Sequence, residues 1–178
     1  MPAYRTPSRG AADWAVTGAD GRAPRVIRSL ALKPEELECH NDRLQAKFRA
    51  IVQHEVRWAG ERLDDAELVV VAYGTAARVV RTAIARAREA GMAVGLLRPI
   101  TLWPFPSTAL AEVAARARAI LVVELSAGQL VEDVRLAVEG RAPVFLHGRT
   151  GGMVPSPTEV LEAMRHAWAT TPPRECER

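Results

Sequence analysis

The sequence predicts an α/β domain in which a mostly parallel sheet carries helices on both of its faces. Two observations predict this fold class. Short apolar runs recur between residues 68 and 147, and continuous runs of this kind are typical of strands buried on both faces. Each run leads into a turn and then into a segment whose apolar residues recur at helical spacing. Such alternation of strand and helix indicates parallel strands joined by right-handed crossovers.

Length and composition limit the classes of function. With 178 residues, the chain is long enough for one domain with extensions, and such a domain needs neither disulfides nor a metal for stability. The net charge of +3 is small and the arginines are spread along the chain, so nucleic-acid binding is not indicated. Cys39 and Cys176 lack CxxC or histidine partners at metal spacing. Because we find no signal peptide and no membrane-spanning apolar run, we expect a soluble, cytoplasmic protein.

The region before the alternating elements divides into two parts. Residues 1–33 contain many glycines and prolines and predict an irregular arm or connector, which Trp14 and residues 26–27 could anchor to a surface. Residues 34–60 predict a connecting helix that begins at Pro34, followed by a short edge strand. The apolar residues of this helix fall on one face: Leu37, Leu44, Phe48, Ile51 and Val52. We expect that face to pack on the core of this domain, or else on a neighbouring domain.

Residues 61–170 predict the α/β domain itself, and residues 171–178 a tail. The predicted strands are residues 68–73, 93–98, 119–124 and 143–147. The predicted helices are residues 76–90, 107–118, 129–139 and 157–168. Ser107 is the expected N-cap of the second of these helices. The last helix has the clearest start, because Ser156, Pro157 and Glu159 form a capping box with proline at the first helical position.

A proline-rich segment, residues 97–106, follows the second predicted strand. Its three prolines exclude both a helix and a central strand, because proline lacks an N–H group and fixes φ. The segment also carries large apolar side chains, including Trp103 and Phe105. These side chains either cover the core of this domain or dock on a partner. Docking would expose an apolar patch in the isolated chain and favour self-association.

A candidate ligand site lies where predicted strands end and helices begin, since ligands of open α/β sheets gather at that edge. The residues expected there are Gly74, Thr75, Glu124, Ser126 and Gly128. Their N–H groups could hold an anion, although simple turn formation by the glycines is the alternative. Glu124 is either a general base or, as we expect, a helix cap or inter-subunit ion-pair partner. We identify no catalytic triad and no metal-binding cluster in the sequence.

Four segments resemble one family. They are residues 69–75 (VVVAYGT), 97–106 (LRPITLWPFP), 122–124 (VVE) and 148–155 (GRTGGMVP). Together they resemble the C-terminal domain of transketolase-like enzymes. More narrowly, they resemble the α subunit of 2-oxoacid:ferredoxin oxidoreductases of the 2-oxoglutarate or branched-chain 2-oxoacid type. The resemblance extends roughly from Asp13 to Arg165.

The resemblance implies a three-layer α/β/α domain with a five-stranded sheet. Its first strand, near residues 56–59, would be a short antiparallel edge strand. The strands that end at Tyr73 and Glu124 would be neighbours, so that their loops form the switch point of the sheet. Trp103, Phe105, Arg149 and Met153 lie in the segments that carry the resemblance and are the candidate interface residues.

The resemblance also implies a function. In such enzymes thiamine diphosphate and Mg²⁺ support decarboxylation of a 2-oxoacid, iron–sulfur clusters pass electrons to ferredoxin, and coenzyme A takes the acyl group. The pyrimidine-binding and diphosphate-binding domains would lie on other chains or regions, so we expect this chain to bind no cofactor by itself. Its expected role is structural, in assembly with those chains. The alternatives are an independent small-molecule or anion-binding module and, less favoured, a free-standing enzyme.

Overall fold

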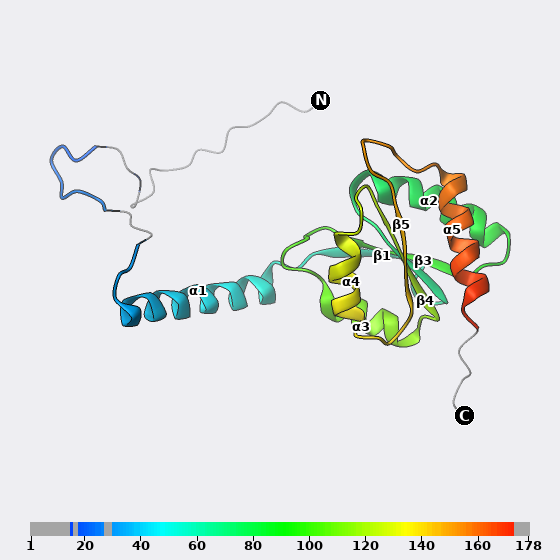
Figure 1. Ribbon diagram of the computed structural model, residues 1–178, viewed down its shortest axis with the longest axis horizontal. Helices are drawn as coiled ribbons and strands as arrows, with labels where there is room; N and C mark the ends of the chain where they lie inside the picture. The colour runs from blue at the N-terminus through cyan, green and yellow to red at the C-terminus, as the bar shows by residue number, and fades with distance from the viewer. Residues whose placement is uncertain (1–14, 16–17, 27–29, 173–178) are drawn as a thin grey trace. The chain divides into compact units, whose positions relative to one another are not determined.

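The computed structural model describes residue 15, residues 18–26 and residues 30–172 (Figure 1). The chain divides into two units, one ending at Ala46 and the other beginning at Lys47. Trp14, Ile27 and Cys176, which entered the sequence-based expectations, lie outside the described residues. The second unit contains the α/β domain and every residue of the predicted ligand site and interface.

One sheet of five strands forms the middle layer of the second unit. The strands are β1 (Trp58–Glu61), β2 (Leu68–Val71), β3 (Val94–Pro99), β4 (Ala119–Glu124) and β5 (Val144–Gly148). Their order is β1-β3-β2-β4-β5, and β1 pairs antiparallel with β3 while the other pairs are parallel. The predicted fold class is therefore confirmed. The antiparallel edge strand begins at Trp58, two residues later than expected.

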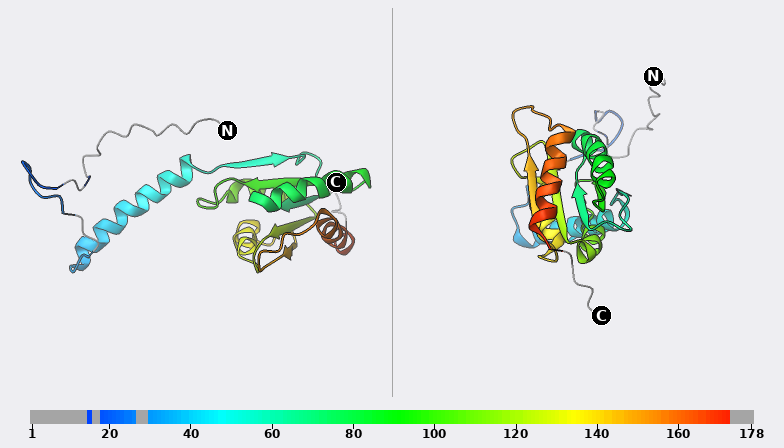
Figure 2. Two further views of the ribbon diagram at one scale, coloured as in Figure 1. Left: turned by 90° about the horizontal axis from the view of Figure 1, so that it is seen from above. Right: turned by 90° about the vertical axis from the view of Figure 1, so that its right-hand side faces the viewer.

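Two pairs of helices cover the two faces of the sheet (Figures 1 and 2). The helices are α2 (Gly74–Glu89), α3 (Ser107–Arg116), α4 (Leu130–Val138) and α5 (Pro157–Thr170). Alternate residues of β2 point to opposite faces: Leu68 and Val70 pack with α2 and α5, whereas Val69 and Val71 pack with α3 and α4. All four are fully buried, which explains why the strand reads as one continuous apolar run.

The two predicted helix starts have different outcomes. The capping box at α5 is confirmed: the Ser156 hydroxyl accepts the Glu159 N–H at 3.2 Å, and the Glu159 carboxylate accepts the Ser156 N–H at 2.7 Å. The prediction that Ser107 caps α3 is wrong, because Ser107 is already the first helical residue and Pro106 precedes it. The Ser107 N–H bonds the Phe105 carbonyl at 2.8 Å, so a tight turn about Pro106 starts the helix without a side-chain cap.

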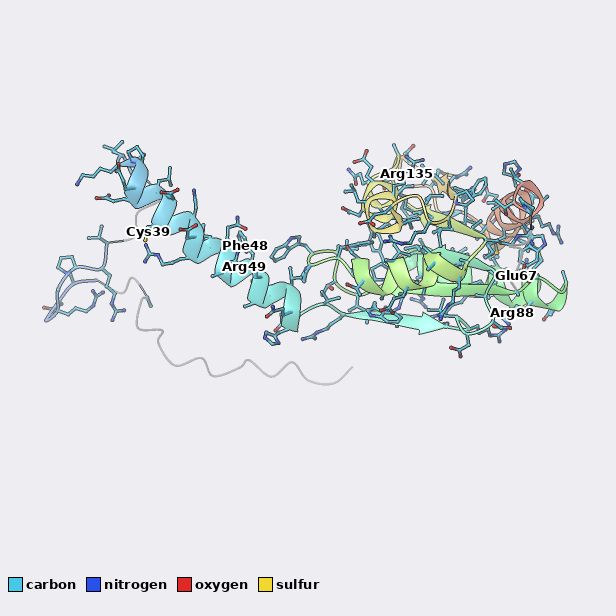
Figure 3. All side chains as sticks on the ribbon, turned by 90° about the horizontal axis from the view of Figure 1, so that it is seen from below. Cys39, Phe48, Arg49, Glu67, Arg88 and Arg135 are labelled. Carbon is cyan, nitrogen blue, oxygen red and sulfur yellow. The ribbon has the colours of Figure 1, made fainter. Side chains whose placement is uncertain are left out.

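Helix α1 (Pro34–His54) has no buried residue. For the part of α1 that lies in the second unit, the expectation that its apolar face packs on the core of this domain is therefore wrong. Phe48 and Val52 remain 38% and 50% exposed, and Figure 3 labels Phe48 on this helix. The physical reason is that α2 with α5, and α3 with α4, already cover the two faces of the sheet. Among the described residues, no helix is long and apolar enough to span a membrane.

Candidate functional site

The carboxyl ends of β2 and β4 form the centre of the candidate site. These two strands are neighbours, as expected, so the turn at Gly74 and Thr75 lies at the same edge as the loop that follows Glu124. Gly74 begins α2 with φ of +55°, a conformation that favours glycine. Tyr73 stands at the N-cap of α2 and makes no side-chain hydrogen bond to the first turn.

Glu124 occupies the other half of this site, and its carboxylate accepts hydrogen bonds from donors of this same chain. Its side chain is 1% exposed. The carboxylate accepts the N–H groups of Gln129, Leu130 and Val131 at 3.1, 2.9 and 3.2 Å, and the Ser126 hydroxyl also donates to it. A negative charge at this position also interacts favourably with the dipole of α4. These contacts support the helix-cap interpretation of Glu124 rather than the general-base interpretation.

The loop between β4 and α4 packs closely against the end of β5. The Arg149 N–H donates to the Glu124 carbonyl at 3.1 Å. A Cβ atom built on Gly148 would lie 2.5 Å from the Ser126 carbonyl oxygen, so only glycine permits this approach. Gly128, with φ of +116°, completes the turn into α4. Gly148 is the last residue of β5, and its need for close approach to Ser126 depends on a contact between distant segments.

Arg149 and Met153, the candidate interface residues in the loop before α5, lie in different surroundings. Arg149 is half-buried and forms an ion pair with Glu159 at 3.1 Å. Hydrogen bonds from Ser156 hold the pKa of the Glu159 carboxyl below its usual value, and the positive charge of Arg149 lowers that pKa further. Met153 is 54% exposed. Arg149 therefore supports the start of α5, while Met153 projects into solvent.

Hydrogen bonds to Arg57, just before β1, anchor the proline-rich segment. The Arg57 carbonyl accepts the N–H groups of Ile100 and Thr101 at 2.9 and 3.1 Å, and the Arg57 N–H donates to the Thr101 hydroxyl at 3.0 Å. The same hydroxyl donates to the Pro104 carbonyl at 2.9 Å. The peptide bond between Trp103 and Pro104 is cis. These contacts fix the path of the segment.

Trp103 and Phe105 take opposite positions on this segment. Phe105 is half-buried and packs against the core beneath α3 and α4. Trp103 is 59% exposed, and its ring meets that of Phe48 edge to face, with centroids 5.6 Å apart. The core-covering alternative therefore holds for Phe105 and not for Trp103, and docking of Trp103 on a partner stays a prediction.

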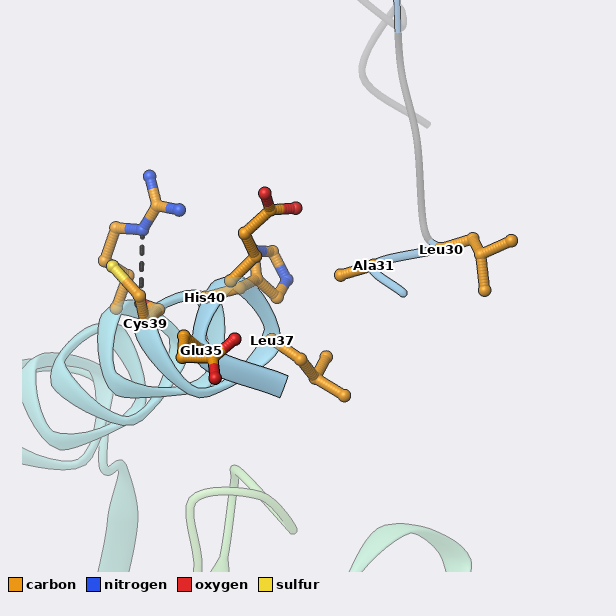
Figure 4. A pocket seen from close by; sticks show the side chains of 8 residues that line it. Leu30, Ala31, Glu35, Leu37, Cys39 and His40 are labelled. Atoms are coloured by element: carbon orange, nitrogen blue, oxygen red, sulfur yellow. Dashed lines mark hydrogen bonds between the residues drawn. The ribbon is translucent and has the colours of Figure 1, made fainter. Parts of the chain in front are cut away.

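We call the candidate site at the carboxyl ends of β2 and β4 the strand-end site. Two of the hollows outside this site lie beside exposed apolar side chains. One, of about 440 Å³, lies beside Val52, Trp58 and Phe105. The other, of about 510 Å³, lies on the first unit between exposed side chains such as Leu30 and Leu37 (Figure 4). None of the strand-end residues lines either hollow. Within the described part of the chain, no group of three His, Cys, Asp or Glu side chains could hold a metal ion.

A protein-family model matches most of the α/β domain. The family described as pyruvate:ferredoxin oxidoreductase core domain II matches residues 66–160. The matched range begins just before β2, includes β3, β4 and β5, and ends in the first turns of α5. It therefore covers more than half of the chain and includes both halves of the strand-end site.

Individual proteins agree with this match. The ketoisovalerate oxidoreductase subunit VorB of Methanothermobacter thermautotrophicus is 44% identical over 152 residues, which are 85% of this chain and 43% of VorB. This chain thus spans less than half the length of that relative.

Two solved structures also match. One is 2-oxoglutarate:ferredoxin oxidoreductase from Magnetococcus marinus with 2-oxoglutarate, coenzyme A and succinyl-CoA bound. It matches 77% of this chain and 24% of its own chain, at a TM-score of 0.67 and 21% identity. An inactive β4 tetramer of a split-gene transketolase matches 64% of this chain and 41% of that one, at a TM-score of 0.54 and 20% identity. The two solved structures share the fold.

Proposed function

We propose a function from the premise that this chain belongs to the family of pyruvate:ferredoxin oxidoreductase core domain II. The chain forms part of a thiamine diphosphate-dependent 2-oxoacid:ferredoxin oxidoreductase, as a C-terminal domain or a truncated α subunit. The complete enzyme converts a 2-oxoacid and coenzyme A to acyl-CoA and carbon dioxide, and ferredoxin accepts the two electrons released. This chain serves assembly and shapes the surroundings of the active site.

The observation that carries the proposal is the 44% identity to VorB over 85% of this chain. A local motif would explain identity in one loop only. Identity of this extent includes the sheet, the strand-end loops and the proline-rich segment together. The substrate class is a 2-oxoacid, because VorB is named as a subunit of a ketoisovalerate oxidoreductase and the Magnetococcus marinus enzyme is solved with 2-oxoglutarate bound.

The described residues do not fit a thiamine diphosphate site or an iron–sulfur cluster. Magnesium needs oxygen ligands, but the buried carboxylate at the strand ends, Glu124, already accepts bonds from N–H and O–H donors. An iron–sulfur cluster commonly uses four cysteine thiolates, and the chain has two cysteines. We therefore assign both cofactors to other chains or regions of the enzyme.

A chimera tests the proposal. The 152-residue segment of VorB that matches this chain is replaced by the corresponding residues of this chain, and the chimera is co-expressed with the other subunits of that oxidoreductase. The expected result is a soluble complex that reduces ferredoxin when ketoisovalerate and coenzyme A are both present. The matched control carries the equivalent segment of the split-gene transketolase, which shares the fold at 20% identity.

Two results distinguish family membership from fold alone. Activity in the chimera and none in the transketolase control would support the proposal. A chimera that assembles with the other subunits and yet shows no dependence on ketoisovalerate or coenzyme A would contradict it.

A further inference from the structure

An exposed apolar surface of the second unit has no role in the strand-end site. We call it the aromatic face and define it by Phe48, Val52, Trp58, Ile100, Leu102 and Trp103. Between 38% and 59% of each of these side chains is exposed. Large apolar side chains that gather in one place on a surface indicate an interaction site, whereas single exposed ones do not.

Contacts and shared neighbours connect most of these residues. Phe48 and Trp103 touch edge to face. Val52 and Trp58 line the same hollow of about 440 Å³, next to Phe105. Trp58 on β1 lies opposite Pro99 on β3, and Ile100 follows directly. The end of α1, the start of β1 and the proline-rich segment therefore share this face.

The chemistry of the aromatic face favours a protein partner with an apolar surface. Residues 99–111 contain no charged side chain. The cores of protein interfaces are depleted in charge and enriched in tryptophan, tyrosine and phenylalanine. The backbone that carries Trp103 is also held in place in advance, because the Thr101 hydroxyl bonds backbone groups of both Arg57 and Pro104. A backbone segment that is already fixed loses less entropy when it docks.

We propose that the aromatic face receives the remaining part of a VorB-like subunit, the part that lies outside the segment matched by this chain. This inference rests on the proposed function. It is supported by length, because the matched segment is only 43% of VorB. It is also supported by packing, because both faces of the sheet are already covered by helices of this chain whereas the aromatic face is not. Trp103 and Phe48 are the anchors of the contact.

Footprinting with hydroxyl radicals tests this contact without any need for activity. The labelling rate of Trp103 is measured by mass spectrometry in the isolated chain and in the VorB chimera. Burial of a side chain that is 59% exposed should lower that rate about fivefold or more in the chimera. Leu136 on α4 is the control: it is 75% exposed, lies outside the aromatic face and should be labelled equally in both proteins.

A pair of variants gives a second measurement. Trp103→Ala should lower the melting temperature of the chimera clearly more than that of the isolated chain, whereas Leu136→Ala should affect both proteins equally. Labelling of Trp103 at the same rate in chimera and isolated chain would overturn the inference, and so would a wild-type chimera that fails to fold. Sedimentation of the isolated chain tests whether a second copy of this chain occupies the aromatic face instead. A stable dimer in which Trp103 is already protected would assign the face to that second copy and would also overturn the inference.

The failure of this inference differs from the failure of the proposed function. An active chimera with unprotected Trp103 leaves the function in place and removes the contact. A folded, protected chimera without 2-oxoacid oxidation keeps the contact and removes the function.

Discussion

At the scale of single residues, Glu124 shows how one buried carboxylate stabilises a loop and a helix together. Its side chain accepts hydrogen bonds from Ser126 and from the first N–H groups of α4. We predict that Glu124→Ala lowers the free energy of unfolding by about 3 kcal/mol, because these donors lose a charged acceptor inside the protein. Urea unfolding at neutral pH measures the loss.

Glu124→Gln is the matched control, since it keeps the size of the side chain and one acceptor oxygen. It should retain part of the stability that Glu124→Ala loses. If both variants unfolded like the wild type and instead lost a bound ligand or an activity, the helix-cap interpretation would be wrong and the general-base interpretation would regain support.

At Gly74 the backbone conformation, and not a lack of room for a side chain, restricts which residue can be accommodated. The φ of Gly74 is +55°, and no heavy atom lies within 4 Å of a Cβ built there, apart from its two chain neighbours and the backbone of the first turn of α2. We predict that Gly74→Val costs about 2 kcal/mol of stability, because a β-branched residue is strained in the left-handed region. Gly74→Asn, which tolerates that region better, should cost less. A Val variant that melts like the wild type but no longer binds an anion would favour the ligand-site interpretation of this turn.

Glu61 and Arg81 connect the edge strand β1 to α2. The Arg81 guanidinium donates to both carboxylate oxygens of Glu61 at 2.8 and 3.0 Å, and these hydrogen bonds lower the pKa of Glu61 from its ordinary value of 4.5. Because the pKa is lower in the folded state, the stabilisation is complete above the unfolded-state pKa and is lost as the pH falls through the folded-state pKa. The pair is exposed, so its contribution is below about 1 kcal/mol.

We therefore predict that Glu61→Gln reduces the decrease in stability that the wild type shows between neutral and acid pH. Thermal unfolding at about pH 7 and about pH 3 measures this difference. Arg81→Gln should have the same effect, and the double variant should show no further change because both substitutions remove one interaction. Equal pH dependence in the wild type and all variants would contradict the prediction.

At the scale of elements, the proline-rich segment combines a core contact with an exposed aromatic ring. Trp103 is 59% exposed and touches Phe48, whereas Leu110 on the adjoining helix α3 is fully buried. We predict that Trp103→Ala changes the stability of the isolated chain by less than about 1 kcal/mol. Leu110→Ala, the control, should cost about 2 to 5 kcal/mol because it leaves a cavity in the core.

Chemical unfolding of the two variants decides between the two roles of Trp103. A cost for Trp103→Ala as large as that for Leu110→Ala would show that the ring belongs to the core of the isolated domain. It would then be unavailable as an anchor of the aromatic face.

At the scale of the whole molecule, the chain belongs to a family of ferredoxin-oxidoreductase domains and matches 43% of the length of VorB. We predict that the isolated chain neither binds thiamine diphosphate nor decarboxylates 2-oxoacids, because its strand-end carboxylate is committed to α4. Titration calorimetry with thiamine diphosphate and magnesium should give only heats of dilution. A stoichiometric binding isotherm with micromolar affinity would contradict the prediction and would place a cofactor site on this chain.

The sequence by itself determined the fold class and most of the element order. Val69, Val70 and Val71 belong to a short apolar run, which is typical of a strand buried on both faces, and all three are fully buried. The capping box of α5 was equally predictable, since Ser156 and Glu159 are three residues apart and meet within one turn. Both features are formed by residues that are neighbours in the sequence, so the sequence alone is enough to predict them.

Only the tertiary structure decided what each exposed or buried side chain does. The apolar spacing of α1 defines a face, but whether Phe48 and Val52 are covered depends on helices far along the chain. Trp103 and Phe105 are two residues apart and equally apolar, yet only Phe105 meets the core. Glu124 is a cap because the chain turns back and brings the N–H groups of Leu130 and Val131 to its carboxylate. For Phe48, Val52 and Phe105 the outcome depends on contacts between distant segments, and for Glu124 on the path of the loop that leads into α4. Hydrophobicity and spacing along the chain specify neither.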